Sequence, residues 1–265
     1  MRGSFQYLLV RQDEGVLTIT MNRPEVLNAF NDLMLEELTE AVESAARDDA
    51  VRCVIIAGAG RAFGSGQDLS VLASAHSAAE PVKVSTHLQK YHHLVQVLHE
   101  MPKPVIAAMQ GVAAGISLNI ALACDLRIAS DEARFRQAFA RIGLVPDGGG
   151  AYFLPRLVGL GKALEMALLA DDMNAQEAER YGLVNACVPL AELEAATRTL
   201  ARRLANGPTR AYGLIKELLY TAVDSDLPTV FALEGKLQDI AIETADHREG
   251  VAAFLQKRPP NYSGQ

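Results

Sequence analysis

The chain has 265 residues, of which 49% are hydrophobic, and it carries a formal net charge of −7. That length and hydrophobic content suit one large domain, or a domain with a small appendage. The negative charge argues against a general nucleic-acid or membrane-surface binder, although it allows a local basic patch for an anionic ligand. Cys53, Cys124 and Cys187 are widely spaced and odd in number, so we expect buried free thiols in a reducing compartment, without a disulfide frame or metal site.

Two segments bear on targeting and on membranes. The first seven residues contain no long apolar run, so we expect no signal peptide and a cytoplasmic location. Residues 103–126 are apolar, but Pro104, Gly111 and Asn119 are among the residues that interrupt them, and a membrane span needs about 20 mostly apolar residues. We therefore expect a buried strand, a turn and a buried helix there, with no membrane or nucleic-acid partner.

Strands and helices alternate through the first half of the chain. Residues 5–11 and 15–21 alternate in polarity and predict two strands joined by a turn at Asp13-Glu14-Gly15. Asn31-Asp32 is typical of a helix start, and an apolar stripe continues to about Arg47. The pattern then predicts a strand at 54–57, a mobile loop at 71–82, a helix at 84–100, a strand at 105–109, a turn at 111–115, a helix at 116–123 and a strand at 126–129.

The second half of the chain is helical almost to its end. A helix is expected over 148–158, and Asn174 is a possible cap for the next one. Strands followed by helices indicate a sheet-containing core and a helical C-terminal region. The remaining helices are expected at 191–204, 209–223, 227–243 and 247–255.

A single carboxylate, Asp147, lies between Pro146 and three consecutive glycines at the start of the helix expected over 148–158. The proline fixes its own φ and the glycines permit backbone angles that other residues avoid. A carboxylate held in such a turn is well placed to act as a positioned acid/base. Asp is also a favoured N-cap residue, so a purely structural role as the cap of that helix is the alternative.

Two glycine-rich loops follow strands upstream. Gly60-Arg-Ala-Phe-Gly-Ser-Gly-Gln-Asp-Leu69 allows close approach of a ligand to the backbone, but it lacks the Gly-Lys-Ser/Thr ending of a phosphate loop. An ordinary connector is the alternative. Gly111-Val-Ala-Ala-Gly-Ile-Ser-Leu-Asn119 enters a helix whose first N–H groups have no helical partner, and Ile116 would supply one of these donors. Two such donors from separate loops form an oxyanion hole that stabilises an enolate.

These loops resemble those of the enoyl-CoA hydratase/isomerase family, which has the crotonase fold. The resemblance runs from about Gln6 to Tyr262. The matching segments are Asn22-Arg-Pro, Leu27-Asn-Ala-Phe, Ala62-Phe-Gly-Ser-Gly-Gln-Asp-Leu, Lys103-Pro-Val-Ile-Ala-Ala, Ala123-Cys-Asp-Leu-Arg-Ile-Ala and Glu249-Gly-Val-Ala-Ala-Phe-Leu-Gln-Lys-Arg-Pro-Pro.

The resemblance implies an α/β fold in which a crotonase-like spiral of ββα units occupies residues 1–200 and a helical trimerisation region occupies 201–265. It implies a homotrimer or hexamer and an acyl-CoA thioester substrate. No metal or separate cofactor is implied, because coenzyme A is part of the substrate. The thioester oxygen would accept hydrogen bonds from the backbone N–H groups of Gln67 and Ile116.

The residues that match the family's acidic positions separate its activities. Hydratases of the family have glutamates where this chain has Asn119 and Phe139, and many enoyl-CoA isomerases use the acid at the second position. Dienoyl-CoA isomerases have aspartates matching Asn119 and Asp147, of which only the second is present. The chain instead resembles phenylacetate-degradation isomerases, which convert ring-1,2-epoxyphenylacetyl-CoA to the oxepin form and shift enoyl-CoA double bonds. This implies that Asp147 is the acid/base and that Asn119 orients the acyl group or Asp147.

Other candidates are weaker. Asp68 is expected to stabilise its loop, and the family resemblance implies that Lys257 contacts coenzyme A phosphates, often from a neighbouring subunit, with Phe254 packing near the adenine. His87, His92, His93 and His99 share one expected helix, where a solvated or interface face is favoured over a metal site. A hydratase with displaced catalytic groups and an acyl-CoA-binding protein without catalysis remain alternatives. The residues expected to bind coenzyme A or substrate are Ala62, Gly66, Asp68, Leu69, Phe139, Phe254 and Lys257.

Overall fold

The computed structural model describes residues 5–69 and 84–265. The expected first hairpin is present: β1 (Leu8–Asp13) pairs antiparallel with β2 (Val16–Met21). The turn between them uses positive φ angles at Glu14 and Gly15. The loop expected at 71–82 lies outside the described residues.

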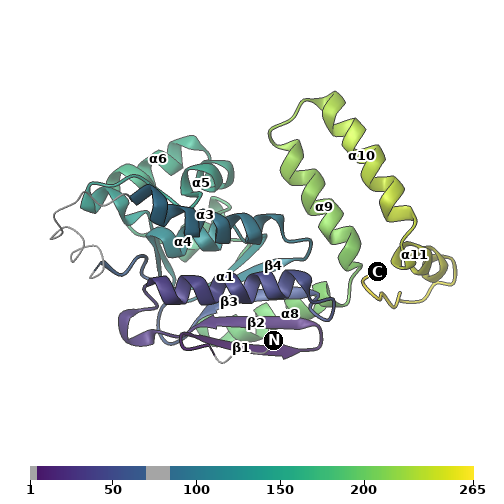
Figure 1. Cartoon of the computed structure of the whole chain (residues 1–265), viewed down its shortest axis with the longest axis horizontal. Coiled ribbons are helices and arrows are strands. Elements are labelled where there is room, and N and C mark those ends of the chain that lie inside the picture. The colour runs from purple at the N-terminus through teal and green to yellow at the C-terminus, as the bar shows by residue number, and fades with distance from the viewer. Residues whose placement is uncertain (1–4, 70–83) are drawn as a thin grey trace.

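A six-stranded sheet forms the centre of the molecule (Figure 1), in the order β1-β2-β3-β4-β6-β9. All of its pairs after the first hairpin are parallel. Buried parallel strands are typically continuous apolar runs, as in Val105-Ile-Ala-Ala-Met109, where all five residues are buried. The strands that follow the hairpin are β3 (Cys53–Gly58), β4 (Val105–Met109), β6 (Leu126–Ser130) and β9 (Ala186–Val188).

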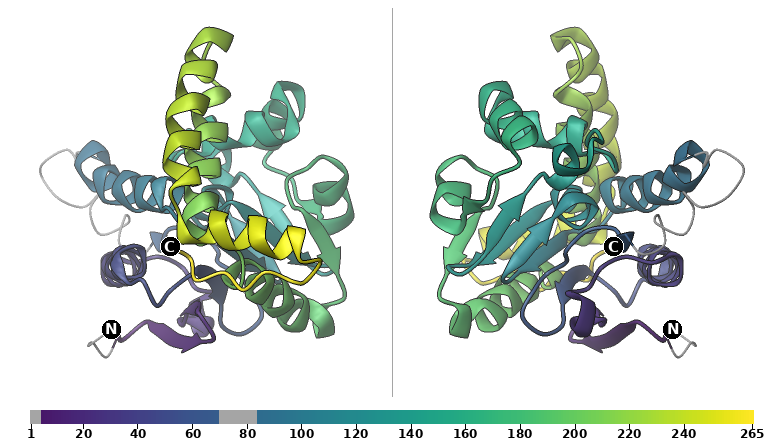
Figure 2. Two further views of the ribbon diagram at one scale, coloured as in Figure 1. Left: turned by 90° about the vertical axis from the view of Figure 1, so that its right-hand side faces the viewer. Right: turned by 90° about the vertical axis from the view of Figure 1, so that its left-hand side faces the viewer.

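Helices cover both faces of this sheet (Figures 1 and 2). Helix α1 (Asp32–Arg47) begins at the predicted cap, where Asn31 Oδ1 accepts a hydrogen bond from the Met34 N–H at 2.9 Å. It packs with α3 (Val84–Glu100) on the face that carries the larger hydrophobic cluster. Helix α8 (Leu193–Ala205) covers the other face and buries a smaller cluster against β3, β4 and β6.

A second, three-stranded sheet was not predicted. The segment expected to be a plain turn at 111–115 contains strand β5, which pairs with β7, and β7 pairs with β8. These strands have only two or three residues, too few for an alternating pattern to be recognised. The same is true of β9, which lies within the region expected to be helical. The strands of the second sheet are β5 (Val112–Ala114), β7 (Arg134–Arg136) and β8 (Met173–Asn174).

Four short helices follow the strands of the second sheet along the chain. Asn174 forms the cap that its position predicts, as part of a capping box with Glu177. Short 3-10 helices occur at Pro24–Val26, Ala138–Ile142 and Leu190–Glu192. The helices are α4 (Gly115–Leu122), α5 (Gly150–Val158), α6 (Leu160–Leu169) and α7 (Ala175–Arg180).

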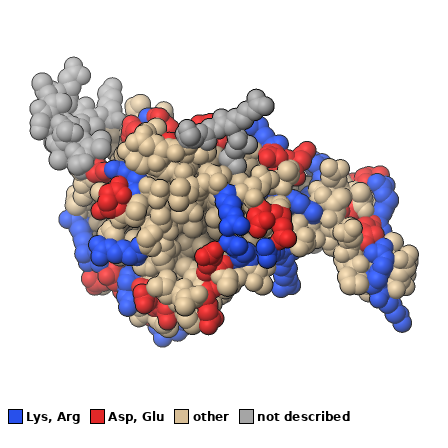
Figure 3. All heavy atoms as spheres, turned by 90° about the horizontal axis from the view of Figure 1, so that it is seen from below, with Lys and Arg blue, Asp and Glu red and all other residues tan. Residues whose placement is uncertain are grey.

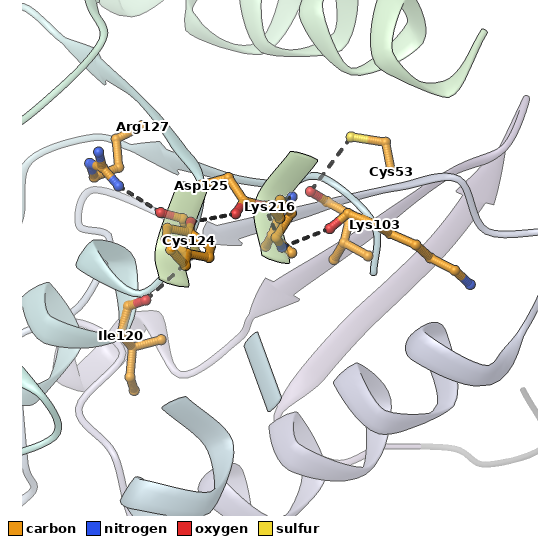
Figure 4. A network of polar contacts seen from close by, with 10 residues as sticks. Cys53, Lys103, Ile120, Cys124, Asp125, Arg127 and Lys216 are labelled. Carbon is orange, nitrogen blue, oxygen red and sulfur yellow. Dashed lines mark hydrogen bonds and ion pairs between the residues drawn. The ribbon is translucent and has the colours of Figure 1, made fainter. Parts of the chain in front are cut away.

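The last three helices form an arm that projects from the core (Figure 1): α9 (Thr209–Ala222), α10 (Leu227–Ile242) and α11 (Ala245–Leu255). Asp125 anchors α9 to the core (Figure 4). Its carboxylate accepts hydrogen bonds from Lys216 Nζ at 2.8 Å and from the Tyr220 hydroxyl at 2.6 Å. Lys216 also donates to the Lys103 carbonyl at 3.0 Å. Helix α8 runs across residue 200 and packs on the sheet, so the projecting arm starts with α9.

The arm leaves a large apolar surface uncovered in the single chain. Of the 16 residues of α10, only Leu237 is buried. Contiguous exposed apolar surface of this kind marks interaction sites. The large exposed apolar side chains of α9 and α10, and of the segment between them, are Ile215, Leu219, Val223, Leu227, Phe231 and Ile242.

The remaining expectations from composition have mixed outcomes. Cys53 and Cys124 are buried free thiols, whereas Cys187 is only half-buried, because β9 lies at the edge of its sheet. On the face drawn in Figure 3, acidic and basic side chains are interspersed. Among the described residues, no helix combines the length and apolar character that a membrane span requires.

Candidate functional site

The two glycine-rich loops lie against each other. Gly64 N–H donates to the Val112 carbonyl at 3.0 Å, and Ala114 N–H donates to the Gly64 carbonyl at 2.9 Å. Gly66 N–H donates to Ser117 Oγ at 3.0 Å. A Cβ added at Gly64 would lie 2.5 Å from that same hydroxyl oxygen, so only glycine permits this approach.

Each loop presents one backbone N–H that the fold leaves unused. Phe30 forms a parallel bridge with Gln67 by hydrogen bonds to Gly66 and Asp68, so the N–H of Gln67 itself points away from that bridge. Ile116 is the second residue of α4, in the turn whose N–H groups have no helical acceptor. Within the described residues, neither of these two N–H groups has a hydrogen-bond acceptor.

Asp147 does not cap helix α5, so that interpretation was wrong. The helix starts at Gly150, its N-cap is Gly149 with φ +79°, and no side chain caps it. The consecutive glycines shift the start of the helix beyond the carboxylate and make the backbone turn first. The main chain of Asp147 still contributes, since its carbonyl accepts the Gly150 N–H at 2.9 Å. The side chain is therefore not committed to stabilising the helix.

Glycines also bring the Asp147 turn into contact with α4. A Cβ added at Gly148 would lie 2.0 Å from Ile116 Cδ1, and one at Gly150 would lie 2.4 Å from Asn119 Nδ2. Contacts under 3.0 Å are not found for real Cβ atoms. The turn therefore brings Asp147 beside the helix that carries Ile116 only because these two positions have no side chain.

Asn119 holds the backbone of this turn. It is fully buried, and its Nδ2 donates to the Asp147 carbonyl at 2.8 Å. Its Oδ1 accepts a hydrogen bond from Gln137 Nε2 at 2.7 Å. An amide performs both roles, whereas a glutamate or ionised aspartate has no N–H to donate. Gln137 was not predicted as a site residue, because it is 18 residues from Asn119 in sequence and only the fold joins them.

The environment of Asp147 suits proton transfer near neutral pH. Burial disfavours its charged form and raises the pKa of the carboxyl from 3.8 to about 6, while His92 and His87 act in the opposite direction. Its Oδ1 is buried and has no hydrogen-bond partner among the described residues. A buried carboxylate oxygen without a hydrogen-bond partner costs stability, and groups of this kind are concentrated at functional sites.

Four further expected residues lie around the two loops. Ala62 is buried and its carbonyl accepts from Asn28 Nδ2 at 2.8 Å. Asp68 forms an ion pair with Arg23 at 3.3 Å, which agrees with a loop-stabilising role. Leu69 is exposed. Phe139 is buried, and its Cζ would lie 3.9 Å from a Cβ added at Gly115, so an apolar ring occupies this side of α4.

The structure of one chain does not bring Phe254 and Lys257 to these loops. Both are exposed, Phe254 in α11 and Lys257 just after it, and α11 lies at the far end of the arm from α4 and α5 (Figure 1). Two hollows of about 610 and 530 Å³ on the described surface also lie elsewhere, and neither is lined by Gln67, Ile116 or Asp147. The first lies between the core and α9.

Three of the four histidines of α3 make contacts with other side chains of the chain. Within the described residues, no group of three or more His, Cys, Asp or Glu side chains is arranged to hold a metal ion. His87 and His93 pair with the acidic residues Asp32 and Glu43 of α1 at 3.6 and 2.7 Å. His99 lies in an aromatic cluster with Tyr152, Phe153 and Tyr220.

Comparison with known proteins decides the family. A sequence profile described as enoyl-CoA hydratase/isomerase matches residues 11–265. The chain belongs to the enoyl-CoA hydratase/isomerase family. A Rhodobacter capsulatus protein named "Probable enoyl-CoA hydratase" is 44% identical over 263 residues, covering 99% of this chain and 100% of that one. The 1,2-epoxyphenylacetyl-CoA isomerase of Escherichia coli is 41% identical over 260 residues, covering 98% and 99%.

A solved structure supports the same assignment. The crystal structure of an enoyl-CoA hydratase from Bacillus anthracis is 33% identical and superimposes with a TM-score of 0.92, covering 98% of this chain and 100% of that one. The predicted crotonase-like α/β fold is therefore confirmed. The protein is an enzyme of the acyl-CoA hydratase/isomerase class within the crotonase family.

Proposed function

We propose that this member of the family is an acyl-CoA isomerase with Asp147 as its single acid/base. One observation carries the proposal: Asp147 has a buried, unpartnered oxygen and a pKa raised to about 6, beside the helix that presents the free Ile116 N–H. The other two acidic positions of the family are occupied by Asn119 and Phe139. A hydratase needs two carboxylates there to hold and activate water.

In the proposed mechanism, the thioester oxygen accepts hydrogen bonds from the N–H groups of Gln67 and Ile116. Asp147, whose pKa is raised to about 6, acts in its ionised form and removes a proton from the carbon next to the thioester. The electron pair moves into the carbonyl as an enolate, which the two N–H groups stabilise. Protonated Asp147 then returns the proton to a second carbon, so the double bond has moved and no atom is gained or lost.

The proposed substrates are ring-1,2-epoxyphenylacetyl-CoA, converted to the oxepin form, and enoyl-CoA thioesters whose double bond migrates. The name of the Escherichia coli relative supports the first, and the single acid/base supports the second. Enoyl-CoA hydratase is the second candidate, favoured by the name of the Rhodobacter capsulatus relative. Water activation would then depend on Asp147 alone. An acyl-CoA-binding protein without catalysis is the third.

We also propose that the chain assembles as a homotrimer or hexamer through the exposed apolar surface of α9 and α10. Lys257 and Phe254, which lie far from the loops of their own chain, would then reach the coenzyme A of another copy. Coenzyme A would also contact residues of the chain that supplies Asp147. These are Ala62, Gly66, Asp68 and Leu69. A cytoplasmic location remains an expectation from the sequence.

The test is a panel of acyl-CoA thioesters incubated with the pure protein in D2O and followed by mass. Isomerisation leaves the mass unchanged apart from exchanged deuterium, whereas hydration adds the mass of one water. The proposal expects isomerised products from the ring epoxide or from 3-enoyl-CoA, and little 3-hydroxybutyryl-CoA from crotonyl-CoA. Efficient hydration would overturn it in favour of the second candidate, and binding without any turnover would favour the third.

A further inference from the structure

Tyr91, on helix α3, has a contact that the mechanism above does not use. Only 2% of the residue is exposed, and its hydroxyl donates a hydrogen bond to Oε1 of Gln67. Gln67 is the residue whose backbone N–H we assign to the oxyanion hole. A buried side chain from a distant helix is thus attached directly to a residue that contributes to the site.

The same segment is fixed from a second side by Phe30. Its N–H donates to the Gly66 carbonyl at 2.8 Å, and its carbonyl accepts the Asp68 N–H at 2.9 Å. The Phe30 ring packs edge-on against the Tyr91 ring, with centroids 6.0 Å apart. Gln67 is therefore held through its side chain by Tyr91 and through both neighbouring peptides by Phe30.

We propose that Tyr91 is a positioning residue for the oxyanion hole, acting through Gln67. Hydrogen-bond donors stabilise an oxyanion only when they already point at the place where charge develops. Glycine itself places few limits on backbone rotation, and Gly66 has a φ of +102°, so the orientation of the Gln67 N–H depends on the contacts that hold this loop. The hydroxyl restrains the side chain of the next residue and so limits rotation of the peptide that carries the Gln67 N–H.

The surroundings of Tyr91 keep its hydroxyl a donor. Burial, and to a smaller extent the Asp147 and Asp32 carboxylates, raise the pKa of the phenol well above its usual range. His87 also faces the ring, with centroids 5.5 Å apart. The phenol therefore stays protonated at any pH at which the enzyme would work, and the contact to Gln67 does not switch with pH.

The experiment uses the Tyr91→Phe variant of the full chain, which keeps the ring and its packing but removes the hydroxyl. Gln67→Met removes the acceptor while leaving the backbone N–H in place. Tyr181→Phe is the matched control, because Tyr181 lies on the surface near Lys162 and Arg180, away from the loops. The probe is cinnamoyl-CoA, whose conjugated thioester absorbs at longer wavelength when its carbonyl is polarised.

The expected result is a red shift of bound cinnamoyl-CoA with the wild type and with Tyr181→Phe, and a smaller shift with Tyr91→Phe. The kcat for isomerisation should fall by roughly 10-fold in Tyr91→Phe with KM nearly unchanged, a smaller loss than removal of a donor causes. Gln67→Met should show the same pattern, and the double variant should be no worse than either single variant, because both changes break one contact.

The outcomes separate this inference from the proposed function on which it rests. If the wild type binds cinnamoyl-CoA without any red shift, the oxyanion hole itself is absent and both fail. If the wild type shows the shift, and Tyr91→Phe or Gln67→Met retains both the full shift and the full kcat, the hole stands and the positioning role is wrong. Should Tyr91→Phe not fold, Gln67→Met decides the question alone.

Discussion

Helices α4 and α10 are both rich in apolar residues, but they lie in opposite environments. All eight residues of α4 are buried, including the polar side chains of Ser117 and Asn119, and both of these are hydrogen-bonded to loops of the site. Helix α10 buries only Leu237 of its 16 residues. An apolar helix that is buried all round is complete within its own chain, whereas an exposed apolar helix face marks an interaction site.

This difference indicates that the two regions have different roles. The region around α4 has its polar groups fixed by the fold, so the geometry of the candidate site is preformed in one chain. The arm has apolar side chains exposed, and the assembly proposed above would cover them with another copy of the chain. Substitutions in the first region should change catalysis without changing assembly, and substitutions in the second should do the reverse.

The largest effect is expected from Asp147→Asn, which tests the role of the region around α4. The variant keeps the size of the side chain and the backbone contacts to Asn119 and Gly150, but it has no titrating group. We expect kcat for isomerisation to fall by about 10²–10⁴-fold, the usual contribution of a positioned acid/base, with acyl-CoA affinity and oligomeric state unchanged. Steady-state kinetics, ligand titration and light scattering measure these three quantities.

A matched change is Asp171→Asn, because the side chain of Asp171 is 80% exposed and pairs only loosely with Arg141 at 3.9 Å. This variant should retain wild-type kcat. If folded Asp147→Asn performs both epoxide conversion and double-bond migration at wild-type rates, Asp147 is not the acid/base and the mechanism is wrong.

The arm provides the opposite test through Phe231→Asp. Phe231 is 59% exposed on α10, so the change removes nothing from the core of its own chain. Burying a Phe side chain in an interface contributes about 1.5–3 kcal/mol, so we expect subunit dissociation constants to rise by roughly 10–100-fold or more. Analytical ultracentrifugation over a range of concentrations measures this.

The control for the arm is Leu9→Asp, at an exposed apolar position of edge strand β1, where charges are well tolerated. It should leave the assembly unchanged. If Phe231→Asp has no effect on the size of the assembly, the exposed face of α10 is not the subunit interface.

Gly148→Ala tests how closely the site is packed. The added Cβ would lie 2.0 Å from Ile116 Cδ1 at a φ of +50°, so we expect a loss of about 1–3 kcal/mol in stability together with a lower kcat. Gly161→Ala is the matched control in α6, where a Cβ meets nothing within 4 Å, and it should stabilise by about 0.5–1 kcal/mol. Urea unfolding measures the free energy of unfolding of each variant. Equal values for the two variants would contradict the close packing at Gly148.

The sequence predicts the long elements of this fold well and the short ones poorly. Helices α1 and α3 were located within one or two residues, because an apolar stripe over four turns is a strong periodic signal. Strands β7, β8 and β9 were missed, since two or three residues have no detectable period. The family resemblance supplied the spiral arrangement that these local patterns do not contain.

The candidate site was predicted as a set of residues but not as a connected arrangement. Asn119 and Asp147 were named from the sequence, yet the hydrogen bonds from Gln137 through Asn119 to the Asp147 carbonyl join positions up to 28 residues apart. The cap interpretation was wrong because three glycines in a row allow the chain to turn before the helix starts, which moves the cap to Gly149. Propensity at one position does not contain that information.

The raised pKa of Asp147 also predicts how the stability of the protein depends on pH. Its pKa is raised in the folded state from 3.8 to about 6, so the folded state binds this proton more tightly than the unfolded state does. Asp147 therefore favours the folded state most below about pH 4, and this contribution to the free energy of unfolding is lost as the pH rises through about 6. Asp147→Asn does not titrate, so its Tm relative to wild type should rise across that window and be level above about pH 7. For Asp171→Asn, the difference in Tm from wild type should not change with pH. If the difference for Asp147→Asn does not change with pH either, burial does not penalise the Asp147 charge.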